Sequence, residues 1–235
     1  MVLNSKGGCG KSTLATSIAG YFAHAWEGQF GLIDFDPQRS SLDWLRRRPG
    51  HLPYIAGFDG LANGVASVPD HIELLVLDPP ARCHGAELER MVSYAETFIV
   101  PVQPSPIDIS AASRFIQELH DLHRVQDKEV KIAVVANRVR ENLLIWGDLE
   151  KFLNGIKIPF VTHLRDAQNY IRAYTRGMGI HELPPYLGRD DVAQWAPLVK
   201  WLESKKSVPA VKKVVPQPTE THPVEVAAAE LANTP

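Results

Sequence analysis

The chain has 235 residues, of which 45% are hydrophobic and 22% are charged, and its formal net charge at pH 7 is -2. This composition is close to that of an ordinary globular protein and supports a core of normal size. The small net charge excludes a chain that is basic throughout, so any contact with nucleic acid would depend on a local patch.

Apolar runs alternate with amphipathic segments along the first 204 residues. Strands are predicted at residues 1–4, 30–35, 54–58, 72–78, 97–102, 130–137 and 158–164. Helices are predicted at residues 13–25, 40–48, 86–94, 107–124, 143–153, 167–175 and 190–204. Strands that alternate with helices predict an α/β fold with a mostly parallel, twisted sheet and helices on both faces. In such a sheet, ligands bind at the carboxyl ends of the strands.

The composition changes after residue 204. Residues 205–235 carry several prolines, which prevent a continuous helix. We therefore predict one domain over residues 1–204 and a disordered tail over residues 205–235. The tail is interpreted as inert, with the alternative that residues 225–233 form a short helix on a partner. It offers no amphipathic membrane anchor.

Three further observations favour a cytoplasmic protein. The two cysteines, Cys9 and Cys83, are too few for a disulfide framework. The first residues lack the charged and apolar regions of a signal peptide. No apolar run approaches the roughly 18 residues of a membrane-spanning helix. We expect no membrane partner.

A glycine-rich segment lies between the first predicted strand and the first predicted helix. Phosphate-binding loops use glycines so that backbone N–H groups can curl around phosphate oxygens, and the dipole of the following helix favours the same anion. Lys11 can reach the β- and γ-phosphates and the Ser12 hydroxyl can hold Mg²⁺, although Ser5 or Lys6 replaces the first glycine of the motif. ATP and Mg²⁺ are the expected ligands. The expected ATP contacts in this loop are Lys6, Gly7, Gly8, Cys9, Gly10, Lys11, Ser12 and Thr13.

Acidic residues end two of the predicted strands. Asp34 and Asp78 occupy these positions, and Asp36 follows two residues after Asp34. Because the carboxyl ends of parallel strands meet at one edge of the sheet, the acids are expected beside the glycine-rich loop. Asp34 and Asp78 either serve a metal ion or cap the strand ends. Asp36 either takes part in catalysis or caps the helix predicted at residue 40.

Several motifs together resemble the ParA/MinD superfamily. The segment KGGCGKS, with a lysine at position 6, closely resembles the deviant Walker A motif of that family. Residues 34–44 (DFDPQRSSLDW) resemble its switch I, and residues 75–80 (LVLDPP) resemble its Walker B motif and switch II. Residues 100–105 and 137–138 resemble sequence landmarks that occur later in members of the family. The resemblance covers about residues 1–204 and is to the short, single-domain members.

The resemblance implies a P-loop ATPase that pairs with a second copy of itself when ATP is bound. Lys6 would reach across the homodimer to the partner's phosphates, and Asp36 would orient the attacking water. The expected catalytic residues are therefore Lys6, Lys11 and Asp36. The first strand is shorter than in most members of the family, which leaves either a misassigned start or a weakened central strand.

The same resemblance implies roles for four further residues. Asp34 and Asp78 would hold Mg²⁺ through water, together with the Ser12 hydroxyl. Asn137 would hydrogen-bond the edge of the adenine.

The function implied by the resemblance is the partitioning or positioning of a plasmid, a chromosome or a large protein assembly. The dimer would use non-specific DNA as a matrix, as a nucleoid-associated protein in bacteria, and an activating partner protein would stimulate slow hydrolysis. Arg165, Arg172 and Arg176 follow one another at spacings of seven and four. That spacing favours one stripe on a helix, which either contacts DNA phosphates or is a solvated face.

Two alternative functions stay open at this point. One is a carrier ATPase of the same superfamily for an iron–sulfur cluster or another cargo. The position of Cys83, after the second acidic strand, suggests this comparison. The paired interface cysteines that such a cluster needs are missing. The other is an interaction module gated by nucleotide that does not bind DNA.

Overall fold

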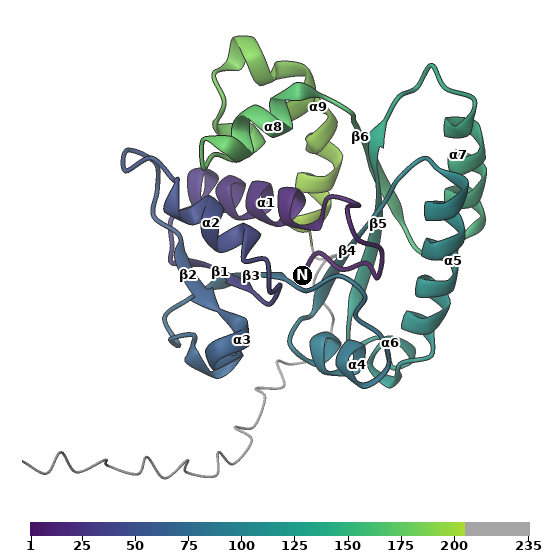
Figure 1. Ribbon diagram of the computed structural model, residues 1–235, viewed down its shortest axis with the longest axis horizontal. Coiled ribbons are helices and arrows are strands. Elements are labelled where there is room, and N and C mark those ends of the chain that lie inside the picture. Colours follow the sequence, from purple (N-terminus) through teal and green to yellow (C-terminus); the bar gives the residue numbers. More distant parts are fainter. Residues whose placement is uncertain (205–235) are drawn as a thin grey trace, which may run out of the picture.

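The computed structural model describes residues 1–204 (Figure 1). The predicted tail, residues 205–235, lies outside the described residues. Strands and helices alternate along the described part, so the α/β class is confirmed. The strands are β1 (Phe30–Asp34), β2 (Ala56–Asp59), β3 (Leu74–Asp78), β4 (Thr97–Val102), β5 (Lys131–Val139) and β6 (Phe160–Arg165).

The helices connect these strands. They are α1 (Lys11–Ala25), α2 (Ser40–Arg46), α3 (Gly60–Asn63), α4 (Gly85–Ser93), α5 (Pro106–His120), α6 (His123–Gln126), α7 (Ile145–Gly155), α8 (Gln168–Thr175) and α9 (Pro185–Leu202). Two short 3₁₀ turns, η1 (Val65–Ser67) and η2 (Ile180–Glu182), were not expected from the sequence. No helix within residues 1–204 is long and apolar enough to span a bilayer.

The strands form two parallel three-stranded sheets, in the orders β2-β1-β3 and β4-β5-β6. The first residues of the chain join them. The Val2 N–H donates to the Leu77 carbonyl oxygen (3.1 Å), and the Leu3 N–H donates to the Ile99 carbonyl oxygen (2.9 Å). Val2 forms an isolated parallel bridge with Ile99 instead of part of a regular strand. The segment predicted as the central strand therefore occupies the centre but is too short for a full ladder.

Helices cover both faces of this joined sheet. Side chains alternate along a strand, so neighbouring residues enter different cores. Leu32 contributes to a core that also contains Trp44 of α2 and Trp195 of α9. Ile33 contributes to a core with Leu88 of α4 and other residues of α4, α5 and α7. Figure 1 shows α1, α8 and α9 on one side of β4–β6, with α5 and α7 on the other.

Two helix predictions differ from the structure. The helix expected at residues 107–124 is divided into α5 and α6, because Leu122 adopts an extended backbone conformation (φ -77°, ψ 135°) that a continuous helix excludes. The helix expected from residue 190 begins at Pro185. Proline is well suited to the first turn, where its missing N–H has no helical partner to lose.

Candidate nucleotide-binding site

The start of the loop before α1 is hydrogen-bonded to two neighbouring segments of the sheet region. The Asn4 side chain donates to the Pro101 carbonyl oxygen (2.7 Å) and accepts from the Lys6 backbone N–H (2.9 Å). The Arg82 N–H donates to the Ser5 carbonyl oxygen (2.9 Å). These bonds connect the start of the loop to the segments after β3 and within β4. Asn4 was not predicted to be a site residue, although its place between a strand and a glycine-rich loop was a usable signal.

Two glycines give the loop its curvature. Gly8 (φ +76°) and Gly10 (φ +98°) both adopt left-handed backbone conformations. A Cβ at Gly10 would lie 2.2 Å from Asn137 Nδ2, so a side chain at this position would displace the Asn137 amide. A loop of this shape can present backbone N–H groups to an anion.

Two side chains from neighbouring strand ends hold carbonyl groups of the loop. Asn137 Nδ2, from β5, donates to the Cys9 carbonyl oxygen (2.8 Å), and Gln103 Nε2, after β4, donates to the Gly8 carbonyl oxygen (3.1 Å). Asn137 thus positions the loop, which the sequence did not indicate, and its contact with adenine stays a prediction. Gln103 belongs to a segment noted for its resemblance but was not assigned a role.

The two loop lysines differ in environment. Lys11 is buried, with 7% of its surface exposed, and its Nζ donates to the Lys6 carbonyl oxygen (3.2 Å). A buried ammonium group is costly without an anionic partner. Within residues 1–204, neither Lys6 nor Lys11 forms an ion pair with a carboxylate. Both cations therefore remain available for an anionic ligand.

Asp78 lies at the carboxyl end of β3 and is fully buried. Its Oδ2 accepts from the Ser41 hydroxyl (2.6 Å), whereas its Oδ1 is buried and has no hydrogen-bond partner in the described part of the chain. Burial raises the pKa of Asp78 to about 6, and the Ser41 and Ser12 hydroxyls near it oppose this rise. The structure thus brings Ser12 and Asp78 together. An oxygen-rich pair with an unsatisfied carboxylate oxygen fits Mg²⁺ and its water ligands.

Asp34 has a clear structural role. Its Oδ1 accepts from the Asp36 N–H (2.9 Å), and its Oδ2 accepts from the N–H groups of Ser41 (2.8 Å) and Leu42 (3.1 Å). The bonds from Ser41 and Leu42 satisfy free donors in the first turn of α2. Burial raises the pKa of Asp34 and the backbone hydrogen bonds oppose it. Its contribution to a metal site stays a prediction.

Asp36 does not cap α2. Its Oδ1 accepts from the Gln38 N–H (2.9 Å), which closes a local turn before the helix, while Asp34 binds the helix donors. The alternative that Asp36 caps the helix at residue 40 is therefore wrong. Asp36 lies in the loop after β1 and is only partly buried. Its catalytic role stays a prediction.

Both thiols are buried. Burial raises the pKa of the Cys83 thiol to about 12, and burial also raises the pKa of the Cys9 thiol. A thiolate ligand must be deprotonated and reachable, so the setting of Cys83 does not favour a cluster at a subunit interface.

The prediction that Arg165 shares one helical stripe with Arg172 and Arg176 is wrong. Arg165 ends β6, and its Nε donates to Oδ1 of the fully buried Asp191 (2.6 Å). A guanidinium group held by a buried carboxylate serves the fold, because separating the pair would leave a buried charge unpaired. Arg172 lies in α8 and Arg176 directly after it, and both are exposed.

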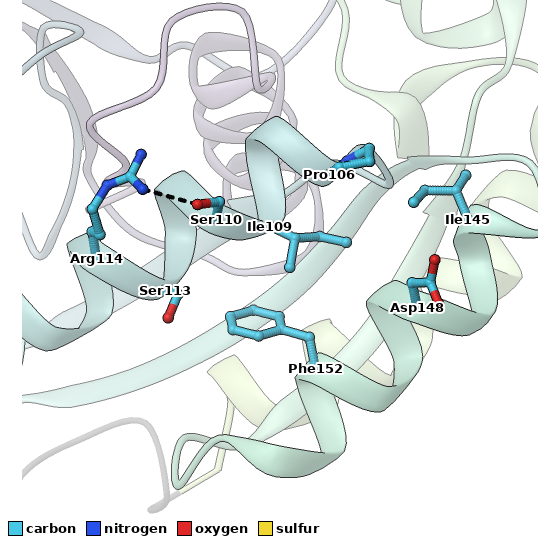
Figure 2. A pocket seen from close by; sticks show the side chains of 8 residues that line it. All are labelled: Pro106, Ile109, Ser110, Ser113, Arg114, Ile145, Asp148 and Phe152. Atoms are coloured by element: carbon cyan, nitrogen blue, oxygen red, sulfur yellow. Dashed lines mark hydrogen bonds between the residues drawn. The ribbon is translucent and has the colours of Figure 1, made fainter.

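A groove lies between α5 and α7, with a volume of about 480 Å³. Figure 2 shows Ile109 of α5 and Phe152 of α7 on facing sides of the groove, near Asp148. Residues that line it are Pro106, Ile109, Ser110, Ser113, Arg114, Ile145, Asp148 and Phe152. None of these belongs to the glycine-rich loop, so the groove is separate from the site described above.

The chain is similar to known proteins in sequence and in fold. It is 26% identical over 189 residues to the maintenance of carboxysome distribution protein A of Halothiobacillus neapolitanus, a match that covers 77% of this chain and 86% of the relative. The structure of Cyanothece McdA in complex with ATP superimposes with a TM-score of 0.63 and 15% identity, covering 84% of this chain and 95% of the other.

A second solved structure has the same fold. The cell division protein MinD from Aquifex aeolicus superimposes with a TM-score of 0.62 and 19% identity, covering 85% of this chain and 94% of the other. Residues 1–180 match the family described as the CobQ/CobB/MinD/ParA nucleotide binding domain. This match includes the glycine-rich loop, both acidic strand ends and Asn137. The chain therefore belongs to the CobQ/CobB/MinD/ParA nucleotide-binding family.

Proposed function

We propose that this protein is an ATP-dependent, dimerising ATPase that positions or partitions a cellular cargo, with non-specific DNA as its matrix. The observation that carries the proposal is the juxtaposition of the phosphate loop with the Ser12–Asp78 pair. Among residues 1–204, Lys11 supplies a buried cation without a carboxylate partner, and Asp78 supplies a buried carboxylate oxygen without a hydrogen-bond partner. The phosphates and metal ion of MgATP would satisfy both groups.

In this proposal the loop binds the phosphates of ATP. The curled segment around Gly8 and Gly10 offers backbone N–H groups, and Lys11 offers its ammonium group. Ser12 and Asp78 would hold Mg²⁺, with Asp34 close by. When bound, Mg²⁺ would neutralise charge on the phosphate oxygens. Asp36, in the turn before α2, would orient the water that attacks the terminal phosphate.

Lys6 supports the dimeric part of the proposal. Its side chain is partly exposed and has no carboxylate partner within residues 1–204, and the adjacent Gly7 and Gly8 are exposed. A cation on an open loop can reach phosphates that lie outside its own subunit. If the partner's ATP receives this charge, pairing depends on nucleotide and hydrolysis releases the pair.

The cargo is proposed from the relatives. The protein from Halothiobacillus neapolitanus is named for carboxysome distribution, which favours a large protein assembly over a plasmid or a chromosome for this chain. The exposed Arg172 and Arg176 support contact with a polyanion such as DNA. We also propose that a partner protein stimulates hydrolysis, which would set the time that the dimer stays on DNA.

Binding of a fluorescent ATP analogue with Mg²⁺ tests the nucleotide site, and phosphate release with and without duplex DNA tests turnover. Lys11→Ala is expected to lose nucleotide binding, because it removes the buried cation of the loop. Lys151→Ala, which changes an exposed lysine on α7, is the charge-matched control and should bind as the wild type does. Undiminished affinity in Lys11→Ala would refute the proposed placement of ATP.

A further inference from the structure

Arg82 is an exposed residue with a left-handed backbone at the edge of the candidate nucleotide site. Its φ is 64°, which is unfavourable for a residue with a Cβ, and such residues cluster at functional sites. Arg39 also has a positive φ (52°), but its guanidinium group forms an ion pair with Asp59 (2.7 Å). Within residues 1–204, Arg82 forms no ion pair with a carboxylate. The strained backbone thus presents a cation that the described fold does not use.

The backbone around Arg82 is held against the glycine-rich loop. The Arg82 N–H donates to the Ser5 carbonyl oxygen (2.9 Å). A Cβ at Gly7 would lie 3.8 Å from Ala81 Cβ, so Ala81 lies beside the loop. On the other side of Arg82, Cys83 is fully buried. The two neighbours therefore fix the backbone of Arg82 in place, while Arg82 itself remains exposed.

This arrangement brings two cations without carboxylate partners to adjacent segments. Lys6 directly follows Ser5, whose carbonyl oxygen binds the Arg82 N–H. Neither Lys6 nor Arg82 forms an ion pair with a carboxylate within residues 1–204. Like charges repel each other, and an anion with several charges would turn this repulsion into attraction. A polyphosphate is an anion of this kind.

The exposure of Arg82 indicates which polyphosphate it serves. Lys11 is buried within the glycine-rich loop of its own subunit, with 7% of its surface exposed. Arg82 follows β3 at the same edge of the sheet and is open to solvent. An exposed cation at this edge can reach a group outside its own subunit. Its guanidinium group is long, permanently charged and planar, which suits bidentate contact with phosphate oxygens.

We propose that Arg82 is a second catalytic cation that acts in trans, on the terminal phosphate of the ATP bound by the partner subunit. The inference deepens the proposed function and rests on its ATP-dependent dimer. In hydrolysis, a water oxygen forms a bond to the terminal phosphorus as the bond from phosphorus to the bridging oxygen breaks. The electron pair of that bond stays on ADP, and a proton from the water passes to solvent. Arg82 would stabilise the negative charge that develops on the phosphate oxygens.

The first test compares Arg82→Ala with Arg90→Ala, which removes the same charge from an exposed position on α4. Release of phosphate from radiolabelled ATP is measured in a single turnover, and light scattering measures the mass in MgATP. Because Lys6 remains to join the subunits, Arg82→Ala should bind ATP and form the dimer as wild type does. Its hydrolysis should be about a hundredfold slower. Arg90→Ala should match wild type in all three measurements.

Arg82→Gly separates the guanidinium group from the backbone strain. Glycine adopts a φ of 64° without strain, so the denaturant midpoint of Arg82→Gly should be higher than that of Arg82→Ala. Both variants should nevertheless hydrolyse ATP equally slowly. Hydrolysis at the wild-type rate in Arg82→Gly would show that the guanidinium group is not needed.

Mixing two inactive variants tests the action in trans. Arg82→Ala and Asp36→Ala chains are combined before MgATP is added. In a mixed dimer, the Arg82→Ala subunit keeps its own Asp36 and receives Arg82 from its partner, so one site is complete. Random pairing makes about half of the dimers mixed, so about a quarter of wild-type hydrolysis should return. If Arg82 served its own subunit, no site in the mixed dimer would be complete.

Four results separate the inference from the proposed function. Wild-type hydrolysis in Arg82→Ala would overturn the inference alone. Slow hydrolysis that mixing does not restore would assign Arg82 to the site of its own subunit and contradict the action in trans. Loss of the MgATP dimer in Arg82→Ala would make Arg82 an interface residue instead of a catalytic one. A wild type that keeps the mass of one chain in MgATP would contradict the dimer of the proposed function itself.

Discussion

At the scale of single residues, the candidate site combines crowded glycine positions with charges that have no partner among residues 1–204. Gly10 illustrates the first case, since a Cβ there would be strained by the left-handed backbone and would clash with the Asn137 amide. Lys11 and Asp78 illustrate the second. These features weaken the fold on its own and are expected where a ligand completes the structure.

Gly10→Ala should distort the phosphate loop. The added Cβ would lie 2.2 Å from Asn137 Nδ2 and the residue would keep an unfavourable φ of +98°, which together should destabilise the protein by about 1–3 kcal/mol and lose ATP binding. Gly147→Ala, on α7 and outside the loop, is the matched control, because an added Cβ there would meet no heavy atom within 4 Å and the backbone φ is not positive. Chemical denaturation and ATP titration measure both effects. Equal stability and equal ATP affinity in the two variants would contradict this description of the loop.

His181 should make the fold sensitive to acid. Burial, with a smaller contribution from His24, lowers the pKa of His181 from 6.5 to about 4, and its ring packs against Tyr21 and Trp195. Between these pKa values only the unfolded chain is protonated, so stability is present above pH 6.5 and is lost as pH falls towards 4. The loss from this group between pH 7 and pH 5 should be about 2 kcal/mol.

His181→Phe keeps a ring in this place and removes the titrating group. Denaturation of wild type and variant at pH 7 and pH 5 should show that the variant loses less stability by about 2 kcal/mol. The same pH dependence in both proteins would show that His181 is not the cause.

At the scale of elements, α2 is held more firmly than a short exposed helix would be on its own. Its contacts include the Asp34 cap, the buried Trp44 and the adjacent Arg48–Glu182 pair, whose side chains are 6% and 0% exposed. Glu182 also accepts from the Gly179 N–H (2.6 Å). These contacts connect the segment around residue 180 to residues 34–44, the segment that resembles switch I.

Glu182→Gln should destabilise the protein by about 3 kcal/mol, because it leaves the buried Arg48 without its anionic partner. Asp43→Asn provides the comparison. It breaks the exposed Arg46–Asp43 pair, whose side chains are 67% and 49% exposed, and should cost less than about 1 kcal/mol. Denaturant midpoints measure both variants. A loss in Glu182→Gln no larger than that in Asp43→Asn would contradict the importance of the buried pair for α2.

The sequence was informative where one local pattern determines structure. The strand at residues 97–102 was predicted with its observed bounds because it is a continuous apolar run between polar segments. The glycine-rich turn before α1 was recognisable because its glycines, Lys11 and Ser12 are close together in sequence. Arg165 was misassigned because its spacing from Arg172 was interpreted as helical, although a strand end and a loop separate them.

Contacts between distant residues could not be predicted from spacing. Ser41 and Asp78 are 37 residues apart, and Asn137 and Cys9 are 128 apart, yet each pair meets in the site. Arg47 and Tyr174 meet only because α2 packs against the segment after α8. Such pairs depend on the order of strands in the sheet and on helix packing, which local periodicity does not specify.

At the scale of the whole molecule, the short first segment, Met1 to Asn4, joins two parallel sheets and leads directly into the phosphate loop. The loop, the acids and α2 therefore share one edge of the sheet. A second subunit facing that edge would place Lys6 near its partner's phosphates, while the arginines beside α8 would be presented by both subunits. This arrangement would let one ATP-dependent event control both pairing and DNA binding.

The most direct test of this function is the mass of the protein by size-exclusion chromatography with light scattering. Wild type, Asp36→Ala and Lys6→Ala are each measured without nucleotide, with MgADP and with MgATP. For Asp36→Ala we predict the mass of two chains only with MgATP, since slow hydrolysis keeps the pair together. For Lys6→Ala we predict the mass of one chain under every condition. The mass of one chain for Asp36→Ala in MgATP, under conditions where ATP is bound, would contradict the ATP-dependent dimer.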